Sequence, residues 1–198
     1  PKIPLSEFTR NETRFRMVER RDPARFRELM DRAQRHVNNR FGLYEHLSHM
    51  TVASAGTQVE DGVRVTAAVP DKKETRELFG VSLYKKRIQP VWIEIENKDE
   101  QPVWFFPVAL DPMYFTPLEA AFLSHFRFSN TANQKMDRYF FENGKDIYVP
   151  AGSSRSGFVF TNLDEGTKSF VIDLVGEDQQ VRTYTFFIPV PGLKIDYY

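Results

Sequence analysis

A tryptophan and two glutamates form the first pattern in this sequence that could carry chemistry. Trp92, Glu94 and Glu96 alternate with apolar residues in a strand-like run, so the three side chains share one face of the predicted strand. Two carboxylates beside an aromatic ring could form a glycosidase pair or a platform for a sugar. Carboxylates two residues apart on one strand would crowd each other rather than flank a glycosidic bond, so the pattern favours a solvated strand face.

The histidines do not form a recognisable catalytic or metal-binding motif. His46 and His49 are spaced to share a helix face, but neither they nor His36 belong to a His-Glu-x-x-His pattern or have a matched carboxylate. Ser124 and His125 are neighbours on a predicted helix and point in different directions, so they cannot serve each other as nucleophile and base. We therefore expect no catalytic residues and no metal ligands.

Two loops contain residue types that occur in binding loops, but neither matches a known pattern. Gly152–Gly157 has Ser156 where a nucleophile elbow needs its second glycine, and it lacks the Gly-Lys-Ser/Thr of a phosphate loop. Asn162–Gly166 offers two carboxylates without the alternating ligand spacing of a calcium loop. The chain has no cysteine, which excludes a thiolate metal site. The sequence therefore predicts no cofactor.

The use of basic residues changes near residue 50. Residues 1–50 hold ten Arg and one Lys against seven acids, a net charge of +4, whereas the remainder holds seven Arg and nine Lys and has a net charge of −4. The whole chain is neutral, which gives no field to attract nucleic acid or anionic lipid. We predict two domains: a helical segment over 1–50, and a domain over 51–198 that folds without it.

The first domain is predicted to be one long amphipathic helix. Asp22 is a good N-cap before Pro23. Apolar residues follow at three- and four-residue steps: Phe26, Leu29, Met30, Ala33, Val37, Phe41, Tyr44 and Leu47. Acids interleave with the arginines, which favours a solvated basic face over a nucleic-acid or membrane role. No apolar run approaches the roughly 20 residues of a membrane-spanning helix, so any membrane association is expected through segments outside this chain.

The stretch Gln89–Val108 is the predicted nucleus of the second domain. Val91, Ile93 and Ile95 share one face, turn residues follow at Asn97–Glu100, and a second apolar run begins at Val103. The two runs are predicted to pair as an antiparallel hairpin. Because apolar residues surround Trp104 and glutamates alternate with Trp92, we expect Trp104 to be the more buried tryptophan.

The remaining pattern predicts a mainly β fold. Residues 51–58 are expected to be a linker, and a short helix is expected at Lys73–Phe79. A helical insert at 112–143 should contain two helices, Pro117–Phe126 and Thr131–Glu142. Further strands are predicted at Val63–Val69, Asp146–Val149, Ser156–Thr161, Ser169–Val175 and Val181–Ile188. This set indicates an immunoglobulin-like antiparallel β-sandwich with a two-helix insert, preceded by the long helix; a closed barrel is the alternative.

Both domains carry a family resemblance. The segment LSEFTRNETRFRM, the Asp-Pro helix start and the LYEHLS ending resemble the carboxy-terminal tail of the 2-oxoacid:ferredoxin oxidoreductases, which use thiamine diphosphate. The tail includes none of that family's cofactor-binding parts. LFGVSLYKKRIQPVWIEIEN, DPMYFTPLEAA, SGFVFTNLDEGTK and TFFIPVPGLK, within residues 57–196, resemble an uncharacterised bacterial domain of envelope or lipoprotein-like proteins, sometimes found beside an LssY-type module. That resemblance implies an envelope or periplasmic setting; a cytoplasmic one is the alternative.

The expected function is non-enzymatic. We expect an envelope-associated β-sandwich module that binds a protein partner or gives structural support. The alternative is a fragment related to the oxidoreductases, without their catalytic parts. Most aromatic residues of the insert are expected to pack on the sheet. Because binding residues concentrate in loops and inserts on a rigid scaffold, a partner patch is the alternative, with Tyr114, Phe115 and Tyr139 as its predicted contacts.

Overall fold

The computed structural model describes residues 9, 13–48, 55–126 and 129–190; the side chains of residues 13–15, 36 and 39–48 lie outside this description. The chain divides into two compact units, Pro1–His49 and Met50–Tyr198. Among the described residues, all strands lie in the second unit, so the predicted mainly β class describes the second unit only.

The first unit consists of two helices, α2 (Thr13–Arg21) and α3 (Pro23–Ser48). Asp22 caps α3, because its Oδ1 accepts the backbone N–H of Arg25 at 3.0 Å. The helix α2 was not predicted. Apolar residues of α3 from Phe26 to Val37 are half-buried, except Leu29, and the predicted positions beyond residue 38 lie outside the described side chains. Neither helix, nor any other in the described part of the chain, is long and apolar enough to cross a bilayer.

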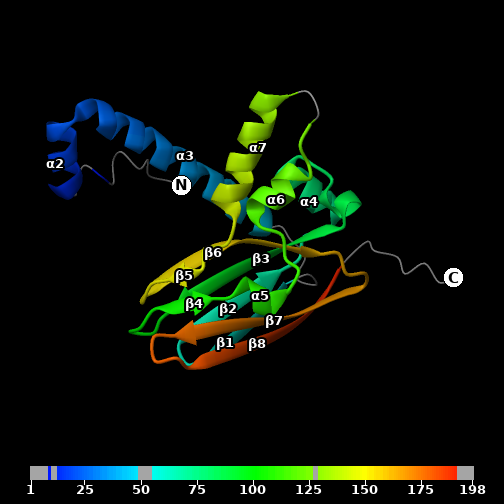
Figure 1. Cartoon of the computed structure of the whole chain (residues 1–198). Coiled ribbons are helices and arrows are strands. Elements are labelled where there is room, and N and C mark those ends of the chain that lie inside the picture. The colour runs from blue at the N-terminus through cyan, green and yellow to red at the C-terminus, as the bar shows by residue number, and fades with distance from the viewer. Residues whose placement is uncertain (1–8, 10–12, 49–54, 127–128, 191–198) are drawn as a thin grey trace. The chain divides into compact units, whose positions relative to one another are not determined.

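The second unit is built on two four-stranded antiparallel sheets (Figure 1). Sheet A has the order β1 (Ala55–Glu60), β2 (Val63–Ala68), β3 (Ile88–Asn97), β6 (Ser153–Asn162). Sheet B has the order β5 (Tyr148–Val149), β4 (Val103–Phe105), β7 (Thr167–Gly176), β8 (Val181–Pro189). Their inner faces form one core that includes Val65, Ile93, Phe105, Ile172 and Leu174, all fully buried. The predicted two-sheet sandwich is confirmed at this level.

The predicted hairpin between the two tryptophan-bearing strands is wrong. β3 pairs with β2 and β6 in sheet A, whereas β4 pairs with β5 and β7 in sheet B. Between them the chain crosses from one layer to the other at Asn97, which is 1% exposed. Its Nδ2 donates to the carbonyl of Gln101 at 2.8 Å, and its Oδ1 accepts the N–H of Asp99 at 3.0 Å. These bonds satisfy the buried amide within the crossover.

The predicted linker at residues 51–58 is also wrong in part. Residues 51–54 lie outside the described residues, but Ala55–Glu60 form the strand β1. This strand pairs with β2 through a turn at Asp61-Gly62, where both residues have positive φ. Small polar residues can occupy an edge strand because its backbone hydrogen bonds need no large side chains.

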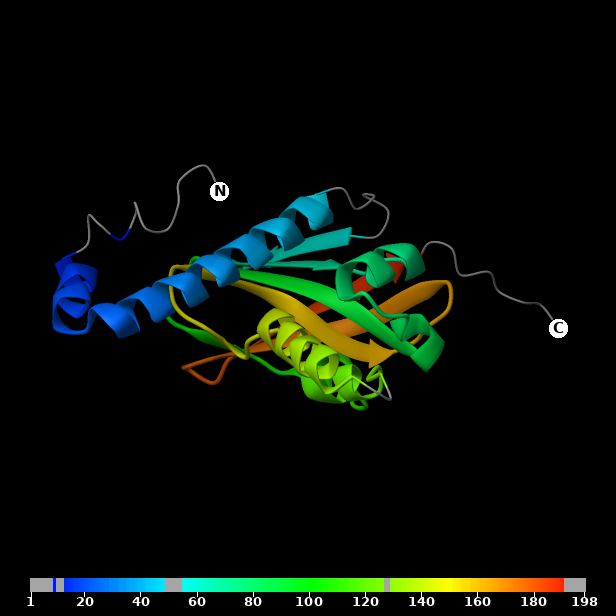
Figure 2. The same ribbon diagram turned by 90° about the horizontal axis from the view of Figure 1, so that it is seen from above.

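Helices cover the outer face of sheet A (Figure 2). They are α4 (Lys72–Phe79), α6 (Pro117–Phe122) and α7 (Asn130–Asn143), while the 3-10 helix η2 (Leu83–Lys86) precedes β3. Phe79 of α4 packs against Phe140 of α7 at 4.9 Å between ring centroids and against Phe158 of β6 at 5.0 Å. This aromatic cluster is a second core. Among the described residues of the second unit, the four-residue helix α5 (Pro107–Leu110) lies beside sheet B.

The predicted ends of α4, α6 and α7 agree with the structure to within one residue, with one exception. α4 ends at Gly80 with φ 69°, and Asp71 and Glu74 form a capping box at its start. The predicted box of Thr116 and Glu119 starts α6. However, α6 ends at Phe122, four residues earlier than predicted.

Tyr84 supplies a test of the fold at high pH. The side chain is buried, its hydroxyl donates to the carbonyl of Pro70 at 2.7 Å, and burial raises the pKa of Tyr84 to about 12. Between pH 10 and 12 the unfolded chain releases this proton while the folded chain retains it, so stability falls as pH rises through that window. We expect a loss of roughly 2–3 kcal/mol in the wild type that is smaller in Tyr84→Phe, measured by urea unfolding from pH 8 to 12. Parallel pH profiles for the two proteins would contradict this.

Candidate functional site

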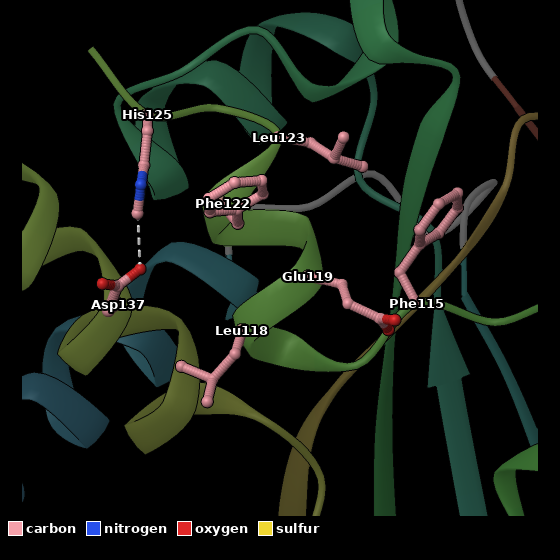
Figure 3. Close-up of a pocket in the computed structure, with 7 residues that line it drawn as sticks. All are labelled: Phe115, Leu118, Glu119, Phe122, Leu123, His125 and Asp137. Atoms are coloured by element: carbon pink, nitrogen blue, oxygen red, sulfur yellow. Dashed lines mark hydrogen bonds and ion pairs between the residues drawn. The ribbon is translucent and has the colours of Figure 1, made fainter. Parts of the chain in front are cut away.

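An open groove of about 520 Å³ lies beside α6 (Figure 3). Its walls come from the segment before α6, from α6 itself, from the residues that follow it and from α7. The lining residues are Phe115, Leu118, Glu119, Phe122, Leu123, His125 and Asp137. The groove is therefore predominantly apolar, with charged and polar groups contributed by three residues.

The helix α6 is oriented with its small residues inward. Ala120 and Ala121 are fully buried, whereas Leu118, Phe122 and Leu123 are 50%, 70% and 45% exposed. A surface helix usually places its large apolar side chains against the core. Leu118 and Phe122 of α6, and Leu123 directly after it, line the groove instead.

Hydrogen bonds from α7 hold the far wall of the groove. Asp137 Oδ1 lies 2.6 Å from His125 Nε2, as the dashed line in Figure 3 shows. One turn earlier on α7, Asn133 accepts the backbone N–H of Phe126 at 2.8 Å and donates to its carbonyl at 2.9 Å. The ring of His125 also meets Phe122 edge-on, at 5.3 Å between centroids. The wall is therefore fixed at several points.

The groove carries negative charge. Glu119 Oε2 accepts the N–H of Thr116 at 2.7 Å, and the hydrogen bonds from the backbone and then the hydroxyl of Thr116 lower the pKa of Glu119. Asp137 adds a second carboxylate, shared with His125. The lining residues include no Lys and no Arg. The groove therefore favours an apolar partner with a positive charge near it.

The pair of His125 and Asp137 is arranged like a base and its orienting carboxylate, but the lining residues include no Ser, Thr, Cys, Lys or Tyr that could act as a nucleophile. Ser124 is half-buried, and its Oγ has no hydrogen-bond partner among the described residues. It is not among the groove's lining residues. The pair joins the end of α6 to α7, and the arrangement suits binding better than covalent catalysis.

The structure separates the three predicted partner contacts. Phe115 lines the groove, and its N–H donates to the carbonyl of Phe160 at 2.7 Å. Tyr114 is half-buried and packs against the sandwich core. Tyr139 is half-buried against Phe79, with 6.1 Å between the ring centroids, and burial raises its pKa. The more exposed groove residues Leu118 and Phe122 were not among the predicted contacts.

The sugar platform considered at Trp92 is not available to a ligand. Trp92 is only 6% exposed, so its ring is not accessible. Further along the same face, Glu96 pairs with Arg64 at 3.3 Å and with Lys98 at 3.2 Å. Glu94 accepts a long hydrogen bond of 3.4 Å from Ser154. This end of the strand is a solvated face.

The candidate ion sites are not assembled in the described part of the chain. Asp164 of the acidic loop pairs with the buried Lys168 at 2.8 Å. The side chains of His36, His46 and His49 lie outside the description. Among the described residues, no three His, Asp or Glu side chains come close enough to hold a metal ion.

Comparison with known proteins finds no matching family model and no matching curated protein.

Proposed function

We propose that residues 51–198 form an immunoglobulin-like β-sandwich module of the bacterial envelope that has no enzymatic activity and binds a protein partner in the α6 groove. The orientation of α6 carries this proposal, because the helix buries two alanines and exposes Leu118 and Phe122. Large contiguous apolar side chains on a surface mark interaction sites. A groove of this kind fits an apolar side chain or helix face of a partner.

Two further features support protein binding. The bonds of Asn133 and Asp137 to the segment after α6 fix the wall before a partner arrives, which lowers the entropic cost of binding. The carboxylates of Glu119 and Asp137 select a partner that places Lys or Arg beside its apolar residue. The envelope setting rests on the resemblance of residues 57–196 to envelope-protein domains.

Crosslinking in an envelope fraction, followed by affinity measurement with the captured protein, tests this function. Replacing both Leu118 and Phe122 by Ala is expected to weaken binding at least about tenfold, because buried anchor side chains dominate interface energies. Phe187→Ala is a matched control, since Phe187 is also 70% exposed but lies on β8. A folded double variant that binds the same protein with unchanged affinity would refute the groove as the binding site.

A further inference from the structure

A row of apolar side chains crosses the outer face of sheet B. The strand register aligns Tyr148, Trp104, Val175 and Val181 on β5, β4, β7 and β8. Tyr148 is 48% and Val181 is 58% exposed, while Trp104 and Val175 are half-buried. The side chains next to Trp104 on β4 are buried in the core, as are Leu174 beside Val175 and Val149 beside Tyr148; the two on β4 are Val103 and Phe105. The row therefore faces away from the sandwich core.

The packing of the second unit does not explain why the residues of this row are apolar. A solvated outer face of an antiparallel sheet normally carries polar residues. The apolar residues on the outer face of sheet A meet α4 and α7, as Phe158 does, but sheet B has only the short α5 beside it within the described part of the second unit. No helix of the described part of the second unit covers the aromatic side chains on the outer face of sheet B.

Oxygen atoms border the aromatic rings. The rings of Trp104 and Tyr148 lie 5.5 Å apart between centroids at 50°. Phe106, 42% exposed, extends the surface beyond Trp104, and its N–H donates to the carbonyl of Asp173 at 3.3 Å. The carboxylate of Asp173 accepts the hydroxyl of Thr183 at 2.8 Å. An aromatic surface therefore adjoins fixed hydrogen-bonding groups.

We propose that the aromatic platform formed by Trp104, Tyr148, Phe106 and Asp173 binds an uncharged glycan chain. The C–H faces of a sugar ring pack on aromatic rings, and its hydroxyls donate to carboxylates at their border. Four adjacent strands at about 4.8 Å spacing give the row a length of roughly 14 Å, which suits an extended chain. This site is independent of the α6 groove.

Other ligand classes fit the platform less well. Both β4 and β7 are paired on each side, so a peptide cannot bind there by adding a strand. The carboxylate of Asp173 and the absence of Lys and Arg from the row of Tyr148, Trp104, Val175 and Val181 disfavour anionic lipid and nucleic acid. A cationic peptide could stack on Trp104 through an arginine, and the test below distinguishes it from a glycan.

The test is cosedimentation of the full chain with microcrystalline cellulose and with chitin. We expect binding to at least one of them, and we expect Trp104→Ala to lower the association constant about tenfold. Phe187→Ala is the matched control, because Phe187 is an exposed aromatic residue on the same sheet, paired with Ser169 at its other end. Far-ultraviolet circular dichroism checks that each variant is folded.

Fluorescence gives a second readout. Trp92 is buried, so a ligand that contacts the platform should shift the emission of Trp104 alone, and the shift should be absent in Trp104→Phe. Failure of the wild type to bind either polysaccharide overturns the proposal, as does equal loss in Trp104→Ala and Phe187→Ala. An arginine-rich peptide that displaces bound polysaccharide leaves the assignment intact, whereas one that binds at Trp104 while neither polysaccharide does overturns it.

Discussion

Replacing Trp92 by Ala is expected to lower the free energy of unfolding by about 3–5 kcal/mol, the usual cost of removing a buried tryptophan. Trp92 is 6% exposed and lies opposite Phe158 on β6 and Ala68 on β2. Phe158 in turn packs against Phe79, so the lost ring would leave a cavity next to the aromatic cluster that joins sheet A to α4. Urea unfolding monitored by circular dichroism measures the loss.

Trp104→Ala is the matched comparison for this experiment. Trp104 is half-buried on the outer face of sheet B, so its removal leaves no closed cavity, and we expect a loss of roughly 1 kcal/mol. This order is the reverse of the one that the sequence predicts. Equal losses, or a larger loss at Trp104, would show that the two tryptophans are not distinguished by burial in solution.

The predicted order of burial of the two tryptophans is wrong because one face of β3 lies in two different environments. Trp92, Glu94 and Glu96 do share a face, as the alternation predicts. Trp92, however, lies opposite Phe158 beneath the helices that cover sheet A. Glu94 and Glu96 lie further along the strand, past the end of these helices, and are half-exposed. Alternation reports which face a residue occupies, but only the tertiary packing decides what covers that face.

Local signals predicted α3, α4, α7 and most strands, since capping and alternation act over a few residues, but they missed α2 and α5. Asp22, Thr116 and Gly80 mark helix ends through hydrogen bonds or φ angles that the sequence specifies directly. Strand partners are non-local. The apolar pattern of the run after Asn97 fits two arrangements: pairing with β3 as a hairpin, or crossing to the second sheet. The hydrogen bond from the buried side chain of Asn97 to the carbonyl of Gln101 stabilises the crossing.

The groove was only partly visible in the sequence for a similar reason. Ala120 and Ala121 beside Leu118 and Phe122 were a usable signal, because small residues on one side of a short helix let it approach a sheet with its large residues outward. The contact between His125 and Asp137 joins residues twelve positions apart, and the distance depends on how α6 and α7 pack. The spacing of His125 and Asp137 in the sequence alone does not predict that their side chains form a hydrogen bond.

Gly157→Ala is expected to be as damaging as the loss of a core side chain, although it adds only one methyl group. A Cβ at Gly157 would lie 2.5 Å from the carbonyl oxygen of Gly144 and 2.6 Å from the Cα of Lys145. Both are backbone atoms, which cannot rotate away as a side chain can. Here the chain leaving α7 runs beside β6, with the N–H of Lys145 donating to the carbonyl of Phe158 at 2.9 Å.

The substitution must therefore push the end of α7 away from sheet A. We expect a loss of about 3 kcal/mol and a fall in Tm of roughly 6–12 °C, together with faster amide exchange at Lys145. Gly56→Ala is the control in the same sheet, because its Cβ would meet only the ring of Phe186, at 3.1 Å. If both variants were equally stable, the close contact between β6 and the end of α7 would not exist in solution. In that case the wall of the α6 groove would lack the support that this contact gives it.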